Sequence, residues 1–102
     1  MSERIEQLRQ AVETMHHCKA SHVQSVPVVE MFGQQKVWEG VVESFALTGH
    51  PQAKRCYAWN FKDGTETRYV IVLEIPPVSS AQTAVRVSIV DDVNRRRKIN
   101  PK

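Results

Sequence analysis

The 102-residue chain has few of the residues that mark several protein classes. Its two cysteines, Cys18 and Cys56, are too few for a disulfide scaffold. Four glycines and five prolines exclude a collagen-like or Pro/Gly-rich disordered chain. No apolar run approaches the roughly 20 residues that a membrane-spanning helix needs. The whole chain is 41% hydrophobic and 25% charged, which is typical of one globular domain.

The net charge of +3 is concentrated at the C-terminal end. Residues 95–102 carry five basic side chains and no acid, which leaves −2 for residues 1–94. We therefore predict one domain over 1–94 and a basic tail over 95–102. The cations that could touch phosphates weakly and in a salt-sensitive way are Arg95, Arg96, Arg97 and Lys98. A solvated helix end explains the same charges, so nucleic acid is an unfavoured partner.

Residues 2–18 predict an N-terminal helix, because Ser2 can cap it and apolar residues recur at three- and four-residue steps. Two β-branched segments, 22–32 and 36–47, predict strands joined by a turn. Pro27 cannot donate to a strand ladder, so the first strand should be an edge strand or carry a bulge at that position. The N-terminus lacks an apolar targeting segment, so we expect a cytoplasmic protein.

Residues 54–61 and 66–75 predict a hairpin around Asp63-Gly64. With Asp63 and Gly64 as the central turn residues, Trp59 lies opposite Arg68. Alternation then places Tyr57, Trp59, Phe61 and Arg68 on one face. The other face is also largely apolar, so neither side of this hairpin suits solvent.

Pro76-Pro77 ends the last strand, and Ser79 with Gln82 predicts the capped start of a C-terminal helix. Residues 83–90 also alternate like a strand, but the capping pattern favours the helix. The expected fold class is α+β in the order α-β-β-β-β-α. Its four-stranded antiparallel meander sheet, either open or strongly curved, is flanked by the two helices, which we expect on one face.

Two helices on one face would leave the other apolar face without cover. An uncovered apolar face is typical of an interaction or ligand site. We therefore interpret the protein as a small binding module that forms a homodimer or binds a small apolar or cationic ligand. The residues expected to carry this surface are Trp38, Glu39, Glu43, Tyr57, Trp59, Phe61 and Arg68.

A small cavity enzyme (lyase, isomerase or hydrolase) is the alternative, with His50 or Glu43 as the acid or base. No sequence motif of a known catalytic or phosphate-binding site supports it. The histidines and cysteine of residues 16–22 lack the spacing of a zinc site, so we expect neither a metal nor another cofactor.

Overall fold

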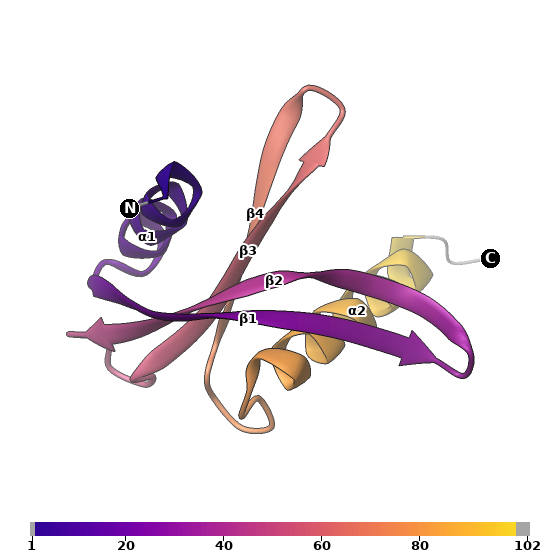
Figure 1. Ribbon diagram of the computed structural model, residues 1–102. Coiled ribbons are helices and arrows are strands. Elements are labelled where there is room, and N and C mark those ends of the chain that lie inside the picture. Colours follow the sequence, from indigo (N-terminus) through magenta and orange to yellow (C-terminus); the bar gives the residue numbers. More distant parts are fainter. Residues whose placement is uncertain (1, 100–102) are drawn as a thin grey trace.

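A computed structural model describes the backbone of residues 2–99 and the side chains of residues 2–92. It confirms the predicted α+β class and element order (Figure 1). The elements are α1 (Glu3–His16), β1 (Lys19–Phe32), β2 (Gln35–Thr48), β3 (Arg55–Asp63), β4 (Glu66–Leu73) and α2 (Ala81–Ile99). The basic side chains of residues 95–98 lie outside the described part of the chain, although the backbone of α2 runs through them.

Both helices begin at capped ends. The Ser2 hydroxyl accepts the N–H of Ile5 at 3.4 Å, as predicted. At α2 the cap is Ser80 rather than Ser79, because its hydroxyl accepts the N–H of Thr83 at 3.2 Å. Residues 83–90 are helical, so the competing strand interpretation is wrong. The seryl cap decides the conformation of this segment despite its β-branched content.

The sheet is an antiparallel meander in the order β1-β2-β3-β4, so β1 is an edge strand as predicted. Pro27 itself pairs with Val41 without a bulge, and the register of β1 shifts between Glu30 and Met31 and, nearer α1, between His22 and Gln24. The extra residue there bends the β1–β2 hairpin where β2 also pairs with β3.

The turn of the β3–β4 hairpin lies one residue later than predicted, which shifts the pairing of the two strands by two residues. Asp63 pairs with Glu66, so Gly64 becomes the first central turn residue, with a positive φ of 67°. Arg68 therefore lies opposite Phe61, and Trp59 lies opposite Val70. A shift of two residues preserves the side-chain alternation, so the predicted faces are retained although the Trp59–Arg68 pair is wrong.

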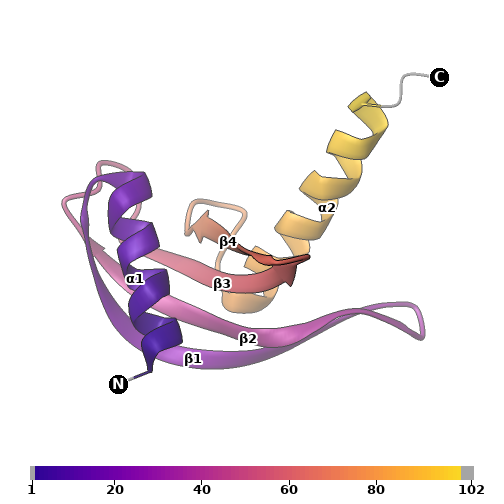
Figure 2. The ribbon, with the colours of Figure 1, turned by 90° about the horizontal axis from the view of Figure 1, so that it is seen from above.

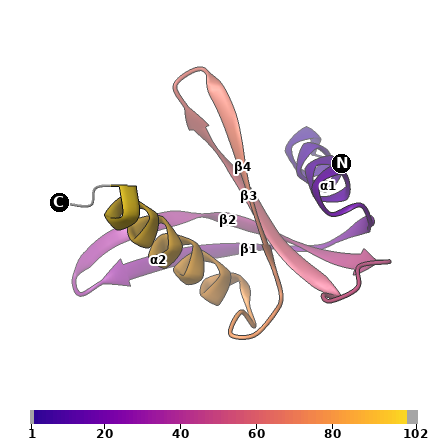
Figure 3. The same cartoon turned by 180° about the vertical axis from the view of Figure 1, so that it is seen from behind.

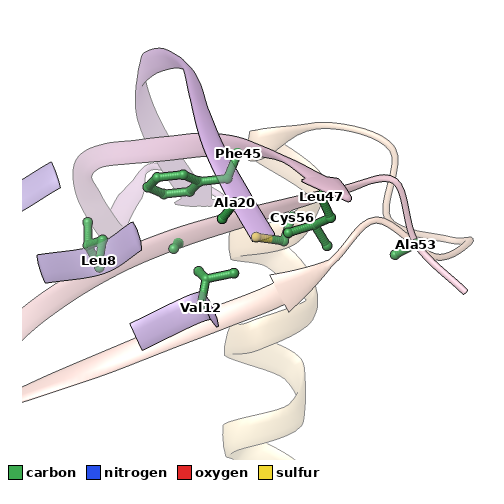
Figure 4. Packing of buried hydrophobic residues seen from close by; sticks show 8 residues of the cluster. Leu8, Val12, Ala20, Phe45, Leu47, Ala53 and Cys56 are labelled. Carbon is green, nitrogen blue, oxygen red and sulfur yellow. The ribbon is translucent and has the colours of Figure 1, made fainter. Parts of the chain in front are cut away.

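The two helices cover opposite faces of the sheet rather than one face. Leu8 and Val12 of α1 pack with Phe45 and Cys56 in one buried cluster (Figure 4). Ala84 and Val85 of α2 pack in a second cluster on the other face, which contains both Tyr57 and Trp59. Figures 2 and 3 show α1 and α2 lying at separate parts of the sheet. This arrangement explains why both faces of the central hairpin are apolar.

The sheet divides into two hairpins that diverge (Figure 1). β1 and β2 pair along their whole length, whereas β2 and β3 pair from Glu43–Ala58 to Ala46–Arg55. The Leu47 N–H extends this ladder to the Lys54 carbonyl at 2.8 Å. Residues 37–42 of β2 and 59–63 of β3 then separate, because coiled two-stranded ribbons twist apart. We call this opening the fork.

Candidate functional site

The fork holds a cleft of about 480 Å³. Side chains and backbone from β2, β3 and the start of α1 line it: Arg4, Trp38, Glu39, Gly40, Val41, Trp59, Asn60 and Phe61. The lining combines three aromatic rings with a cation, a carboxylate and an amide. Aromatic walls with a few polar groups are typical of small-ligand sites. We call this space the fork cleft.

The indole of Trp38 is fixed by its neighbours in the fork cleft. It meets the ring of Trp59 edge-on, with centroids 5.5 Å apart and planes at 70°. It also lies over Gly40, where an added Cβ would come within 2.9 Å of the indole Cη2 atom. Gly40 thus provides the space in which the ring lies, and the Trp38–Trp59 pair forms a preformed aromatic wall.

A buried carboxylate lies beside the fork cleft. Glu43 is 1% exposed and accepts hydrogen bonds from three side chains. Arg4 donates to its Oε2, while His22 Nε2 lies 2.7 Å and Ser25 Oγ 2.5 Å from its Oε1. Arg4 also donates to the Val41 carbonyl at 2.8 Å, on the edge of β2 that β3 has left. We call Arg4, His22, Ser25 and Glu43 the Glu43 cluster.

The Glu43 cluster holds this carboxyl group ionised. Burial by itself raises the pKa of Glu43, but the hydrogen bonds from Ser25, Arg4 and His22 outweigh it and lower the pKa below its ordinary value. The negative charge then neutralises Arg4, whose side chain is 36% exposed. The cluster therefore fixes the N-terminal end of α1 to β2 and positions Arg4 in the wall of the fork cleft.

The structure brings together part of the predicted surface. Trp38, Glu39, Trp59 and Phe61 line the fork cleft, and Glu43 joins it through Arg4. Glu39 is exposed and pairs with Lys36 at 2.5 Å.

Two other predicted surface residues lie elsewhere. Tyr57 is buried beneath α2 and donates its hydroxyl to Glu74. Arg68 lies at the β3–β4 turn and pairs with Asp63 at 2.7 Å.

The histidines near the end of α1 contact different residues. His50 accepts the N–H groups of Gln52 and Ala53 at its Nδ1, both at 3.0 Å, and so orders its own turn. The ring of His16 lies edge-on to His50, with centroids 5.6 Å apart, whereas His22 faces Glu43. Among the described residues, no group of three His, Cys, Asp or Glu side chains is arranged to hold a metal ion.

Sequence reasoning did not identify Arg4, His22 and Ser25 as partners of Glu43. Arg4 lies 39 residues from Glu43, on the polar side of a helix where arginines are common. Glu43 itself gave a usable signal, since it alternates with Val41 and Phe45 on a face that is otherwise apolar. A buried carboxylate needs donors, but the identity of those donors depends on how α1 lies on the sheet.

Comparisons with protein-family models, curated proteins and solved structures find no match to this chain. Within the described residues, neither helix combines the length and apolar character required to cross a membrane. The fork cleft and the Glu43 cluster are therefore the features from which a function can be inferred.

Proposed function

We propose that this protein is a non-enzymatic binding module whose site is the fork cleft. The observation that carries the proposal is the early end of the β2–β3 ladder, which opens a cleft walled by Trp38, Trp59 and Phe61. If β2 and β3 stayed paired along their whole length, backbone hydrogen bonds would close the fork cleft. Sheets ordinarily complete such ladders because unpaired backbone groups are costly, so an opening with aromatic walls favours a ligand.

The chemistry of the walls favours a small ligand with an apolar body and a cationic group. Aromatic faces attract cations through the negative face of the ring. Glu39 adds a carboxylate at the rim, and its exposed pair with Lys36 is weak enough to be exchanged. Arg4 does not oppose a cation strongly, because Glu43 neutralises it.

The groups available for acid–base chemistry support binding over catalysis. A general acid or base works best with a pKa near the working pH, whereas the pKa of Glu43 is lowered by its three donors. Both oxygens of that carboxylate accept hydrogen bonds within the fold. His50, the other candidate, uses its Nδ1 to order a turn.

Titration with phenyltrimethylammonium tests this function. Both tryptophans line the fork cleft, so we expect the cation to change their fluorescence in a saturable way. Phe61→Ala should weaken binding about threefold to tenfold. Phe32→Ala is the matched control, because Phe32 is 79% exposed at the β1–β2 turn and lies outside the cleft lining. Equal effects of Phe61→Ala and Phe32→Ala would contradict the fork cleft as the binding site. A neutral benzene derivative that binds as tightly as phenyltrimethylammonium would contradict a preference for a cationic ligand.

Self-association through the sheet is a second candidate function. Val29, Met31 and Val41 are 46%, 48% and 42% exposed, and the strand register places them on the α1 side of the β1–β2 hairpin, beyond α1 itself. Exposed apolar groups that share a sheet face favour a symmetric dimer.

Light scattering during size-exclusion chromatography tests this dimer. We expect the wild type to elute as a dimer and Val29→Lys as a monomer. Val90→Lys, on α2, is the control and should leave the dimer intact. A wild type that stays monomeric at every concentration would exclude this function.

A further inference from the structure

The edge of β3 that faces the fork has free backbone groups. The carbonyl of Lys54, just before β3, accepts the N–H of Leu47 in β2 at 2.8 Å. Backbone groups of an antiparallel strand point alternately to its two neighbours, so the N–H and C=O groups of Asn60 and Lys62 are directed into the fork. Within the described residues, these groups have no hydrogen-bond partner. Such a free edge can pair with a strand from another molecule.

The facing edge of β2 is partly occupied. The same alternation directs the backbone groups of Glu39 and Val41 into the fork, and Arg4 donates to the Val41 carbonyl at 2.8 Å. The guanidinium therefore blocks pairing at the inner end of this edge, next to the last pair between β2 and β3. Because no described residue covers the edge of β3 in this way, an incoming strand would pair with β3.

The side chains on the two faces of the fork differ in chemistry. An added strand would direct its own side chains alternately to these faces. On the α2 face lies Phe61, which is 48% exposed and lies two residues after Trp59 of the cluster buried by α2. On the α1 face lie Asn60 and, across the fork, the exposed carboxylate of Glu39. A segment in which apolar and basic residues alternate therefore matches both faces.

We propose that the fork binds an extended peptide by strand addition to β3, with a basic side chain beside Glu39 and an apolar side chain against Phe61. The inference rests on the proposed function, because it takes the cationic ligand of the fork cleft to be part of a peptide. Backbone hydrogen bonds to Asn60 and Lys62 supply affinity, and the side chains supply selectivity. The Lys62 ammonium is held by the Thr67 hydroxyl of β4 at 3.1 Å, so it does not oppose the basic side chain.

Titration with the peptide acetyl-Val-Lys-Val-Lys-Val-amide, followed by tryptophan fluorescence, tests strand addition. We expect saturable binding. The same peptide methylated at every backbone nitrogen should bind about tenfold more weakly, because methylation removes its backbone donors. Acetyl-Val-Glu-Val-Glu-Val-amide should also bind about tenfold more weakly, because it brings carboxylates to Glu39.

A proline on either edge of the β3–β4 hairpin locates the bound strand. Asn60→Pro removes an N–H that is directed into the fork and should weaken binding of the lysine peptide about threefold to tenfold. Tyr69→Pro is the matched control, because Tyr69 lies opposite Asn60 and directs its N–H to the outer edge of β4. Asn60→Ala keeps the N–H and should retain binding. Far-ultraviolet circular dichroism checks the fold of each variant.

The outcomes separate strand addition from the proposed function. The inference is overturned if the methylated peptide binds as tightly as its parent, a comparison that needs only the wild-type protein. It is also overturned if Asn60→Pro and Tyr69→Pro weaken binding equally. Saturable binding of phenyltrimethylammonium without binding of the lysine peptide would refute strand addition and leave the proposed function intact. Binding of neither compound would refute both.

Discussion

Replacing Glu43 with glutamine tests the Glu43 cluster directly. The side chain keeps its size but loses its charge and one acceptor atom. If the amide oxygen takes the place of Oε1 beside His22 and Ser25, the amide NH₂ faces the guanidinium of Arg4, and two donors oppose each other. Arg4 then turns to solvent, because its side chain is already 36% exposed.

The size of the effect follows from these contacts. Glu43→Gln removes one charge-assisted hydrogen bond, and such bonds contribute 1.5–3 kcal/mol. The exposure of Arg4 favours the lower half of that range, so we expect a loss of about 2 kcal/mol in the free energy of unfolding. For a chain of this length the corresponding fall in Tm is about 10 °C.

The loss should depend on pH. Because the pKa of Glu43 is lowered in the folded state, its carboxylate stabilises the fold above the ordinary glutamate pKa. The stability difference between wild type and Glu43→Gln is therefore complete at neutral pH. It shrinks as the pH falls through the lowered folded-state value, since both side chains are then uncharged.

Urea denaturation followed by circular dichroism, from about pH 7 to about pH 3, measures both quantities. Glu39→Gln is the matched control on the same strand, because Glu39 is 57% exposed and pairs with an equally accessible Lys36. That control should cost under about 0.5 kcal/mol. Equal losses for the two variants, or a loss for Glu43→Gln that is independent of pH, would refute the reasoning.

Three further perturbations follow from the packing. Leu8→Ala should cost about 3 kcal/mol in urea denaturation, because Leu8 is fully buried between α1 and the sheet; a loss below about 1 kcal/mol would contradict that packing. Gly40→Ala should displace the Trp38 indole and reduce its near-ultraviolet dichroism while the far-ultraviolet spectrum is retained; an unchanged aromatic signal would contradict the contact. Iodoacetamide should modify Cys18 well before Cys56, since burial raises the pKa of the Cys56 thiol to about 12. Mass spectrometry of the native protein measures the order of modification, and earlier modification of Cys56 would contradict its burial.

The sequence was sufficient for the elements because their signals are local. The cap at Ser2 predicts a helix from neighbouring residues alone, and the hairpin around Gly64 depends on the same short range. The hairpin register was two residues off, yet Tyr57 and Trp59 were assigned to the correct face because that face depends on strand alternation.

The fork was not predictable in the same way. It depends on how far two coiled hairpins diverge beyond the Glu43–Ala58 pair, and on the register shift at residues 22–24 that bends one of them. Trp38 and Phe61 were singled out for their residue type, but their common cleft follows from this divergence. Arg4 enters the site because α1 lies across the sheet, which is a tertiary contact without a local signal.

The outer edge of β1 is blocked against pairing, whereas the edges of β2 and β3 at the fork are open, which supports the proposed ligand site in the fork. On the outer edge, the Ala20 N–H donates to Glu13 at 2.8 Å, and the Val29 carbonyl accepts from Gln82 at 3.0 Å. Pro27, between them, has no N–H to donate. Such features prevent another strand from adding to an edge. Within the fork, Arg4 reaches the Val41 carbonyl from the side, and the ring of Phe61, which is 48% exposed, stays accessible to a ligand.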